Sequence, residues 1–158
     1  AILIDSQFWI GYMQLGQAYE QMGQPDLALA ALMDAARFSD RNSKVTSLRG
    51  YLLAKTGRFN EAREVLRQLE SGSPERYVPP VAIALVLAGL GERDGVMEWL
   101  GKAYDERDVH LIYLPVDPKW DVYRADPTFQ ALLARCRFTA STGEGPLSTP
   151  PPSAAQRR

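Results

Sequence analysis

Residues suited to metal, redox or disulfide chemistry are almost absent from this chain. Its 158 residues include one cysteine, Cys136, and one histidine, His110. A structural zinc site takes four cysteine or histidine ligands and a disulfide takes two cysteines, so we expect no metal, no other cofactor and no internal disulfide. A catalytic Cys–His pair would require these two residues to meet from separate predicted segments. The sequence therefore favours a protein that is not an enzyme.

The sequence also lacks the marks of membrane and nucleic-acid proteins. Its formal charge is -1 at pH 7, whereas nucleic-acid-binding domains carry a basic excess that neutralises phosphates. No apolar run reaches the roughly 18 residues needed to cross a bilayer, and the stretch 78–90 is interrupted by prolines. Gly89 and Gly91 lack the third glycine of a phosphate-binding loop. We expect no bound nucleic acid and no membrane insertion; the compartment stays open, with the cytoplasm favoured.

What the chain does contain is a pattern that returns every 34 residues. Gly23 recurs as Gly57 and again as Gly91, and Gly16 recurs as Gly50. A fixed period of this length is typical of helix-turn-helix arrays, in which each unit buries its apolar face against the next. The sequence therefore predicts an all-α fold, a right-handed solenoid of about three helical hairpins.

Apolar periodicity and turn residues predict where the helices lie. Residues 8–22 carry apolar side chains at three- and four-residue intervals, and Gly23 ends this helix because glycine adopts the left-handed conformation easily. Asp5 and Ser6 are expected to form a turn before it. The predicted helices of the hairpins are 8–22, 25–38, 43–56, 60–70 and 81–90, with a partner of the last around Val96 to Tyr104.

The repeat stops after Asp108, and the chain changes character. The apolar stretch 110–115 is predicted to be a connector that lies against the last hairpin. Asp117 and Asp126 each precede a proline, which predicts two short helices with an N-cap carboxylate, the second covering the end of the array. Three carboxylates, Asp105, Glu106 and Asp108, follow a predicted helix end, where we expect them to be solvated.

These patterns divide the chain into six segments. The assignment is 1–8, the end of a preceding repeat; 9–42, 43–76 and 77–110, three repeat units; 111–138, the connector and capping helices; and 139–158, a tail. The tail is rich in Ser, Gly and Pro, a composition that predicts disorder.

The units resemble the tetratricopeptide repeat, whose period is about 34 residues. The first unit matches the family pattern at Tyr12, Leu15, Gly16, Tyr19, Gly23, Ala28, Leu32 and Ala35. The second unit keeps Gly50, Gly57 and Ala62, while the third departs at Pro80 and Ala84. The resemblance covers residues 1 to about 110 and implies a non-catalytic scaffold that binds a protein or peptide.

A second resemblance concerns the third unit and the cap. The matching stretches are Tyr77-Val-Pro-Pro, Leu90-Gly91, Glu98-Trp99-Leu100, Val116-Asp117-Pro118 and Arg124 to Phe129. They are similar to the C-terminal end of repeat regions in large bacterial regulators. This implies a larger multidomain protein whose effector domain precedes Ala1.

In the tetratricopeptide family, the first helix of each unit lines a concave groove. The resemblance implies a peptide-binding groove formed by Met13, Gln17, Glu20, Lys44, Ser47, Tyr51, Lys55, Val81 and Leu85. Lys44 and Lys55, with Tyr51 between them, would contact an acidic or aromatic peptide, or else are solvated lysines. The third unit's end of the groove is apolar, and either receives a hydrophobic peptide or is filled by the chain's own connector and cap.

A structural role is the alternative to peptide binding. Phe8, Trp9 and Ile10, together with the apolar third unit, would then pack against neighbouring repeats or a second copy of the chain. The two hypotheses differ in the oligomeric state that they predict, which the sequence leaves open.

Overall fold

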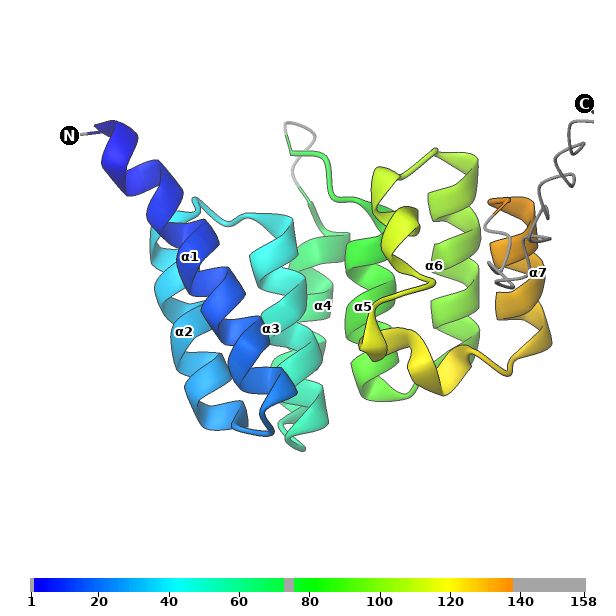
Figure 1. Ribbon diagram of the computed structural model, residues 1–158, viewed down its shortest axis with the longest axis horizontal. Coiled ribbons are helices and arrows are strands. Elements are labelled where there is room, and N and C mark those ends of the chain that lie inside the picture. Colours follow the sequence, from blue (N-terminus) through cyan, green and yellow to red (C-terminus); the bar gives the residue numbers. More distant parts are fainter. Residues whose placement is uncertain (1, 73–75, 138–158) are drawn as a thin grey trace, which may run out of the picture.

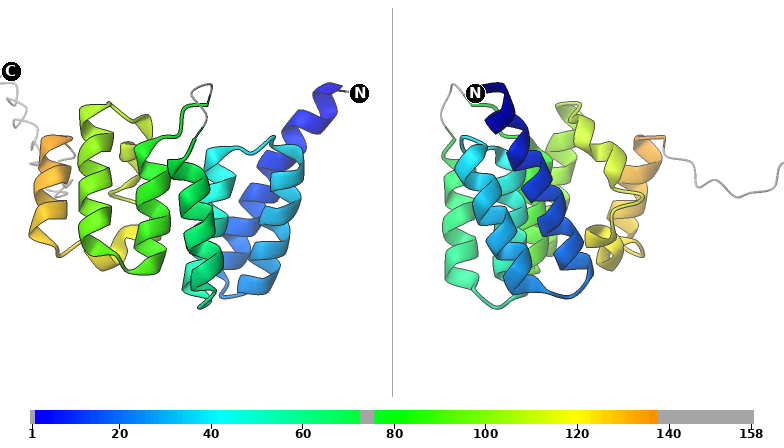
Figure 2. Two further views of the ribbon diagram at one scale, coloured as in Figure 1. Left: turned by 180° about the vertical axis from the view of Figure 1, so that it is seen from behind. Right: turned by 60° about the vertical axis from the view of Figure 1, so that its left-hand side comes forward.

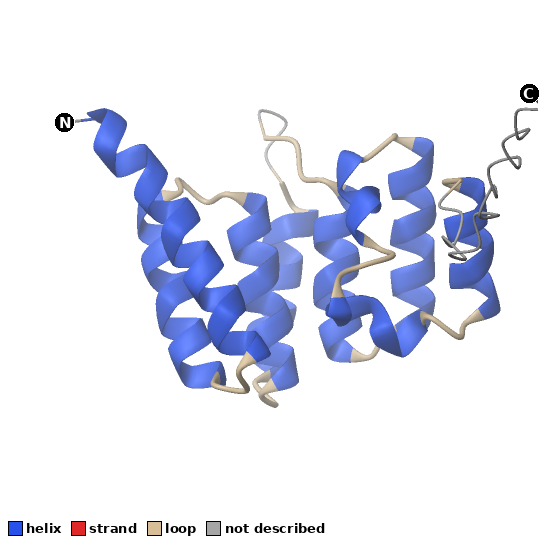
Figure 3. Cartoon of the chain, in the orientation of Figure 1, coloured by secondary structure: helices blue, strands red, loops and turns tan. Residues whose placement is uncertain are grey.

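The computed structural model describes residues 2–72 and 76–137, and the regular elements in these ranges are helices (Figure 3). The α-helices are α1 (Ile2–Gln21), α2 (Pro25–Phe38), α3 (Ser43–Lys55), α4 (Phe59–Glu70), α5 (Pro80–Leu90), α6 (Arg93–Asp105) and α7 (Pro127–Arg135). Two 3-10 helices, η1 (Val109–Tyr113) and η2 (Pro118–Tyr123), precede α7. Consecutive α-helices pack as hairpins that form an array from α1 to α7 (Figure 1). The predicted all-α solenoid is confirmed; the predicted tail lies outside the described residues.

The turn expected at Asp5 and Ser6 is wrong, because α1 is continuous from Ile2. Aspartate and serine cost only about 0.5 kcal/mol each relative to alanine inside a helix, so two such residues do not end a long helix. Figure 1 shows the first turns of α1 extending beyond the end of α2. The assignment of residues 1–8 to a preceding repeat, and the other unit boundaries, stay predictions.

The three hairpin turns share one backbone conformation. Gly23, Gly57 and Gly91 have φ angles of 70°, 81° and 75°, a left-handed region that only glycine enters without strain. In each turn the amide after the glycine donates to the carbonyl five residues earlier: Gln24 to Tyr19, Arg58 to Leu53, and Glu92 to Leu87. These bonds close the helix ends as Schellman motifs. The predicted glycine stops are therefore confirmed.

Helix α3 lies at the centre of the packing, because small residues let its neighbours approach closely. A Cβ atom on Gly50 would lie 2.8 Å from side-chain atoms of both Val65 in α4 and Val86 in α5. A Cβ atom on Gly89 of α5 would lie 2.9 Å from the Tyr51 carbonyl oxygen of α3. Glycines at these positions therefore allow α3, α4 and α5 to pack as one unit.

The first hairpin packs on the second differently from the way the second packs on the third. Helix α1 packs on α2, and α2 packs on α3, but α1 hardly contacts α3, whereas α5 packs closely on α3. The side and rear views show the hairpins stacked along the array, with α1 and α7 at opposite ends (Figure 2). The weak contact between α1 and α3 leaves space on the side of the array that the connector covers.

The connector folds back over the third hairpin. Its helices η1 and η2 contact α6 and α5, and lie in front of them in Figure 1. Leu114 is fully buried, and Trp120 and Tyr123 are 2% and 6% exposed. The connector therefore covers part of α5, and the two alternatives for the apolar end of the groove stay open.

Helix α7 is held to the array by an ion pair at its N-terminus. The Asp126 carboxylate caps α7 by accepting from the Thr128 and Phe129 amides at 2.8 and 3.4 Å. It also accepts from Arg93 of α6, at 2.5 Å from Nε and 3.0 Å from Nη2. Phe129 is fully buried beside this contact. The helix predicted after the second Asp-Pro pair is therefore present, anchored by the capping residue itself.

Acid is expected to remove the stabilising effect of Asp126. The bidentate Arg93 guanidinium and the two amides hold the pKa of Asp126 below its usual value. Its contribution to stability should be fully present above the ordinary aspartate pKa of about 3.9, and should disappear as the pH falls through the lowered folded-state pKa. Urea unfolding measures the free energy of unfolding of the wild type and of Asp126→Asn across this pH range. The two free energies should become equal at low pH.

Asp94→Asn is the matched control, because Asp94 is 96% exposed and also contacts Arg93 but caps no helix. If the free energies of unfolding of the wild type and Asp126→Asn differed by the same amount at every pH, the stabilising role of the ionised Asp126 would be contradicted.

Candidate functional site

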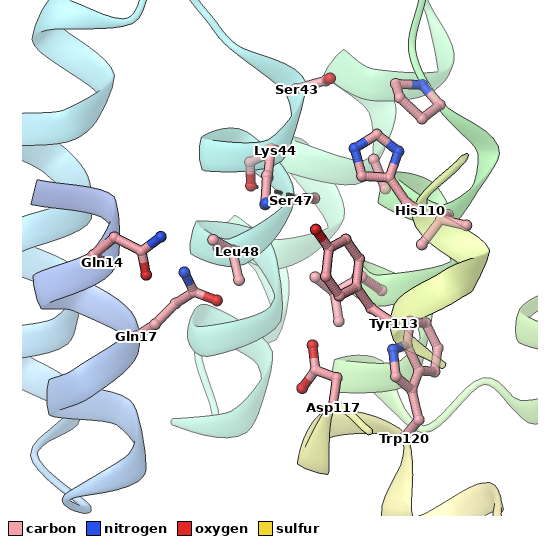
Figure 4. Close-up of a pocket in the computed structure, with 14 residues that line it drawn as sticks. Gln14, Gln17, Ser43, Lys44, Ser47, Leu48, His110, Tyr113, Asp117 and Trp120 are labelled. Atoms are coloured by element: carbon pink, nitrogen blue, oxygen red, sulfur yellow. Dashed lines mark hydrogen bonds between the residues drawn. The ribbon is translucent and has the colours of Figure 1, made fainter. Parts of the chain in front are cut away.

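A cavity of about 300 Å³ lies between α1, α3, α5 and the connector (Figure 4). Leu48 of α3 with Ala82 and Leu85 of α5 give it an apolar lining, and Gln14 and Gln17 of α1 form the opposite wall. This volume lies at the lower end of the range for ligand pockets in proteins. The cavity occupies the space that the weak contact between α1 and α3 leaves open.

Five of the nine residues predicted to form a groove line this cavity: Gln17, Lys44, Ser47, Val81 and Leu85. The other four lie elsewhere. Met13 and Tyr51 are only 4% and 7% exposed and belong to the core. Glu20 lines a narrow gap beside the cavity, and Lys55 is exposed at the end of α3. The resemblance implied that the first helix of each unit lines the groove, but α1 hardly contacts α3 and the connector covers part of the face.

The residues predicted from the sequence did not include the connector residues that complete the cavity. His110, Tyr113, Asp117 and Trp120 line it from the side opposite α1 (Figure 4). Trp120 is 2% exposed, and its indole nitrogen points toward the cavity side. The apolar stretch 110–115 indicated that the connector packs on the array, but a segment without a repeat gives no signal for which side chains face inward.

Asp108 corrects a second expectation, because its carboxylate is buried rather than solvated. The side chain is 2% exposed, and its Oδ2 atom accepts from the Val81 amide of α5 at 3.1 Å. Pro79 and Pro80 have no N–H, so Val81 supplies the first backbone donor of α5. The other oxygen, Oδ1, accepts from the His110 amide at 3.0 Å. One carboxylate thus caps both α5 and η1.

The same carboxylate orients the imidazole of His110. Nδ1 lies 2.7 Å from Asp108 Oδ1, and a carboxylate acceptor there favours the tautomer with the proton on Nδ1. The ring is about one-third exposed, and Figure 4 shows its other nitrogen, Nε2, on the cavity side. His110 therefore presents one free nitrogen at the rim.

Lys44 lies at the same end of the cavity. Its Nζ atom is 5.6 Å from the centroid of the Tyr113 ring, a cation–π distance. Within the part of the chain that the structure describes, no carboxylate lies within 4.0 Å of Lys44. The rim thus carries a cation whose charge no neighbouring carboxylate balances.

The first hairpin, which forms one wall of this cavity, also matches a known repeat. A family model of the tetratricopeptide repeat matches residues 11–42. Residues 11–42 are a tetratricopeptide repeat. The comparisons with curated proteins and with solved structures found no match. Tetratricopeptide repeats are non-catalytic scaffolds that generally mediate protein–protein interactions. Among the described residues, no helix combines the length and apolar character needed to cross a membrane.

A buried lysine ties the connector to the tetratricopeptide repeat. The Lys119 side chain is 4% exposed, and its Nζ lies 3.4 Å from Glu20 Oε2 of α1 and 3.5 Å from Asp117 Oδ1. Tyr51 is buried near these two carboxylates, and its burial and their charges raise its pKa to about 12. The phenol therefore stays neutral, and among the described residues Lys119 supplies the cation that lies within 4.0 Å of both carboxylates. Asp117, one partner in this Lys119 bridge, lies at the end of the cavity away from Lys44 (Figure 4).

Replacing Lys119 by methionine is expected to destabilise the fold. The change keeps an unbranched apolar side chain but leaves Glu20 and Asp117 close together with no cation. Removing one partner of a fully buried pair costs 3–5 kcal/mol, and partial exposure of the two carboxylates reduces this to about 1–3 kcal/mol. Urea unfolding measures the effect.

The control for the Lys119 bridge is Lys55→Met. This lysine is exposed on α3 and outside the cavity, so the expected change is within about 0.5 kcal/mol. If Lys119→Met and Lys55→Met lowered the free energy of unfolding equally, the Lys119 bridge would not hold the connector.

Proposed function

We propose that the chain is a protein-interaction module, and that its partner inserts an apolar side chain of an extended segment into the cavity. The observation that carries this proposal is the cavity itself, which has an apolar lining and a polar rim and lies beside a tetratricopeptide repeat. Concave apolar sites with few polar groups are the usual form of binding sites in proteins. The proposal assigns the anchor contacts to Leu48, Val81 and Leu85.

The walls of the cavity support this proposal because they are held before any partner arrives. Asp108 fixes η1 to the start of α5, and the Lys119 bridge fixes the connector to α1. A preformed site costs little ordering entropy on binding, so even a short segment can bind with useful affinity.

Selection from a displayed library of random peptides tests the proposal. The chain is the bait, and each selected peptide is then measured against Gln14→Trp, which places an indole at the cavity wall. We expect the peptides to share an apolar residue and to lose at least about tenfold in affinity, or 1.4 kcal/mol.

The matched control is Gln21→Trp. Gln21 lies two helical turns later on α1, is exposed, and does not line the cavity. Peptides that bind both variants as well as the wild type would contradict the proposal, because they would bind outside the cavity.

A comparison of the units favours a second candidate function, self-association through the outer face of the first hairpin. In α3, Val45 and Leu52 are 0% and 4% exposed, but the matching positions of α1, 34 residues earlier, are exposed. Phe8 and Leu15 on α1 are 51% and 43% exposed, and Met22, in the turn directly after α1, is 65% exposed. An apolar stripe of this kind is a candidate surface for a second copy.

Light scattering across a hundredfold range of concentration tests this second function. A mass that rises with concentration in the wild type, and not in Leu15→Arg, would support it. The second hairpin carries Arg49 at the matching position, so the fold accepts arginine there. A constant monomer mass would remove this candidate.

A further inference from the structure

The polar rim of the cavity indicates which residues its partner carries. Building on the proposed function, we propose that the bound segment presents an aspartate or glutamate side chain next to its apolar anchor, and that Lys44 and His110 bind this carboxylate together. Both residues line one end of the cavity, and they come from different elements, α3 and η1.

The sign of the charge follows from which rim groups are already compensated. The Asp117 carboxylate at the far end lies 3.5 Å from Lys119 Nζ and accepts from the Lys119 amide at 3.0 Å. Lys119 in turn reaches Glu20, so both carboxylates at this end share one cation of the chain. Lys44, by contrast, has only the Tyr113 ring as a partner among the described residues. The group that gains most from Lys44 is therefore an anion.

His110 adds a second, directional contact. Its Nδ1 faces the buried Asp108 carboxylate, which leaves Nε2 toward the cavity. With Nδ1 donating to Asp108, the ring donates to a ligand only when Nε2 is also protonated. In that form the ring donates to Asp108 through Nδ1 and to the ligand carboxylate through Nε2. Asp108 is thus a positioning residue for His110.

A side chain is the favoured source of the carboxylate. The cavity lies between α1, at one end of the array, and α5, so helices flank it on both sides. An extended segment can pass over the cavity and insert an internal residue, so the peptide need not end there. A chain terminus would present the same chemical group, and the experiment distinguishes the two sources.

The test uses synthetic versions of the peptides selected above, each with a free or an amidated C-terminus. We expect an acidic residue within two positions of the apolar anchor, and an affinity loss of about tenfold when it becomes Gln or Asn. Lys44→Gln and His110→Gln should each weaken binding of the acidic peptide by about tenfold as well. Neither variant should weaken binding further when the peptide already carries Gln or Asn in place of the acidic residue. Lys55→Gln is the control and should leave the affinity unchanged, because Lys55 lies outside the cavity.

The outcomes separate this inference from the proposed function. Peptides that lose binding in Gln14→Trp but have neutral or basic residues beside the anchor would overturn the inference and leave the proposed function standing. Binding that depends on a free C-terminus, and not on the acidic side chain, would also overturn it. Peptides unaffected by Gln14→Trp would remove the proposed function itself.

Discussion

Asp108→Ala is expected to lower the free energy of unfolding by about 2–4 kcal/mol, the largest single effect outside the apolar core. The change leaves the Val81 and His110 amides without an acceptor, and it removes the partner of His110 Nδ1. Buried donors without partners cost about 1–3 kcal/mol each. Two helix starts, those of α5 and η1, lose their cap at once.

Urea unfolding of three variants separates the causes of this loss. Asp108→Asn keeps one carbonyl acceptor and should lose less than Asp108→Ala. Asp105→Ala, in the same run of carboxylates but with a side chain 74% exposed, should change stability by no more than about 0.5 kcal/mol. If Asp108→Ala were as mild as Asp105→Ala, Asp108 would be a surface residue and the orientation of His110 would lose its basis.

Gly89→Ala is expected to destabilise the protein by about 1–3 kcal/mol, although alanine is the better helix former. The added Cβ would lie 2.9 Å from the Tyr51 carbonyl oxygen and 3.0 Å from its Cα. These are backbone atoms of α3, so relief requires the two helices to separate. Because α3 and α5 both line the cavity, the change should also weaken peptide binding.

Gly101→Ala is the matched control, and it should act in the opposite direction. Gly101 lies inside α6, and an added Cβ would meet nothing within 4 Å. Alanine should therefore stabilise this helix by up to about 1 kcal/mol. Thermal or urea unfolding of the two variants gives the signs directly, and stabilisation by both would show that α3 and α5 do not pack as closely as the structure indicates.

The repeat determined how much of the fold could be predicted. Gly23, Gly57 and Gly91 each require a left-handed backbone, and this local requirement fixed the hairpin turns without knowledge of tertiary contacts. The Asp-Pro pairs were informative for the same reason, because a cap and a proline act on adjacent residues. By contrast, nothing local ends a helix at Asp5, and α1 continues through it.

The cavity was only half predictable from the sequence. Residues such as Lys44 and Leu85 were found because repeat positions transfer from one unit to the next. His110 and Asp108 were not assigned to the site, because their roles depend on where the connector folds back, and that is a tertiary contact. Neither a histidine two residues after an aspartate nor a run of carboxylates identifies a buried pair by itself.

The central claim is that a partner's apolar side chain enters the cavity between α1, α3, α5 and the connector. Intermolecular nuclear Overhauser effects between a selected peptide and the methyl groups of the chain test it most directly. The account predicts contacts from the peptide's apolar residue to Leu48, Val81 and Leu85. Contacts instead to Leu15 and Met33, which are 43% and 59% exposed on the first hairpin, would contradict it.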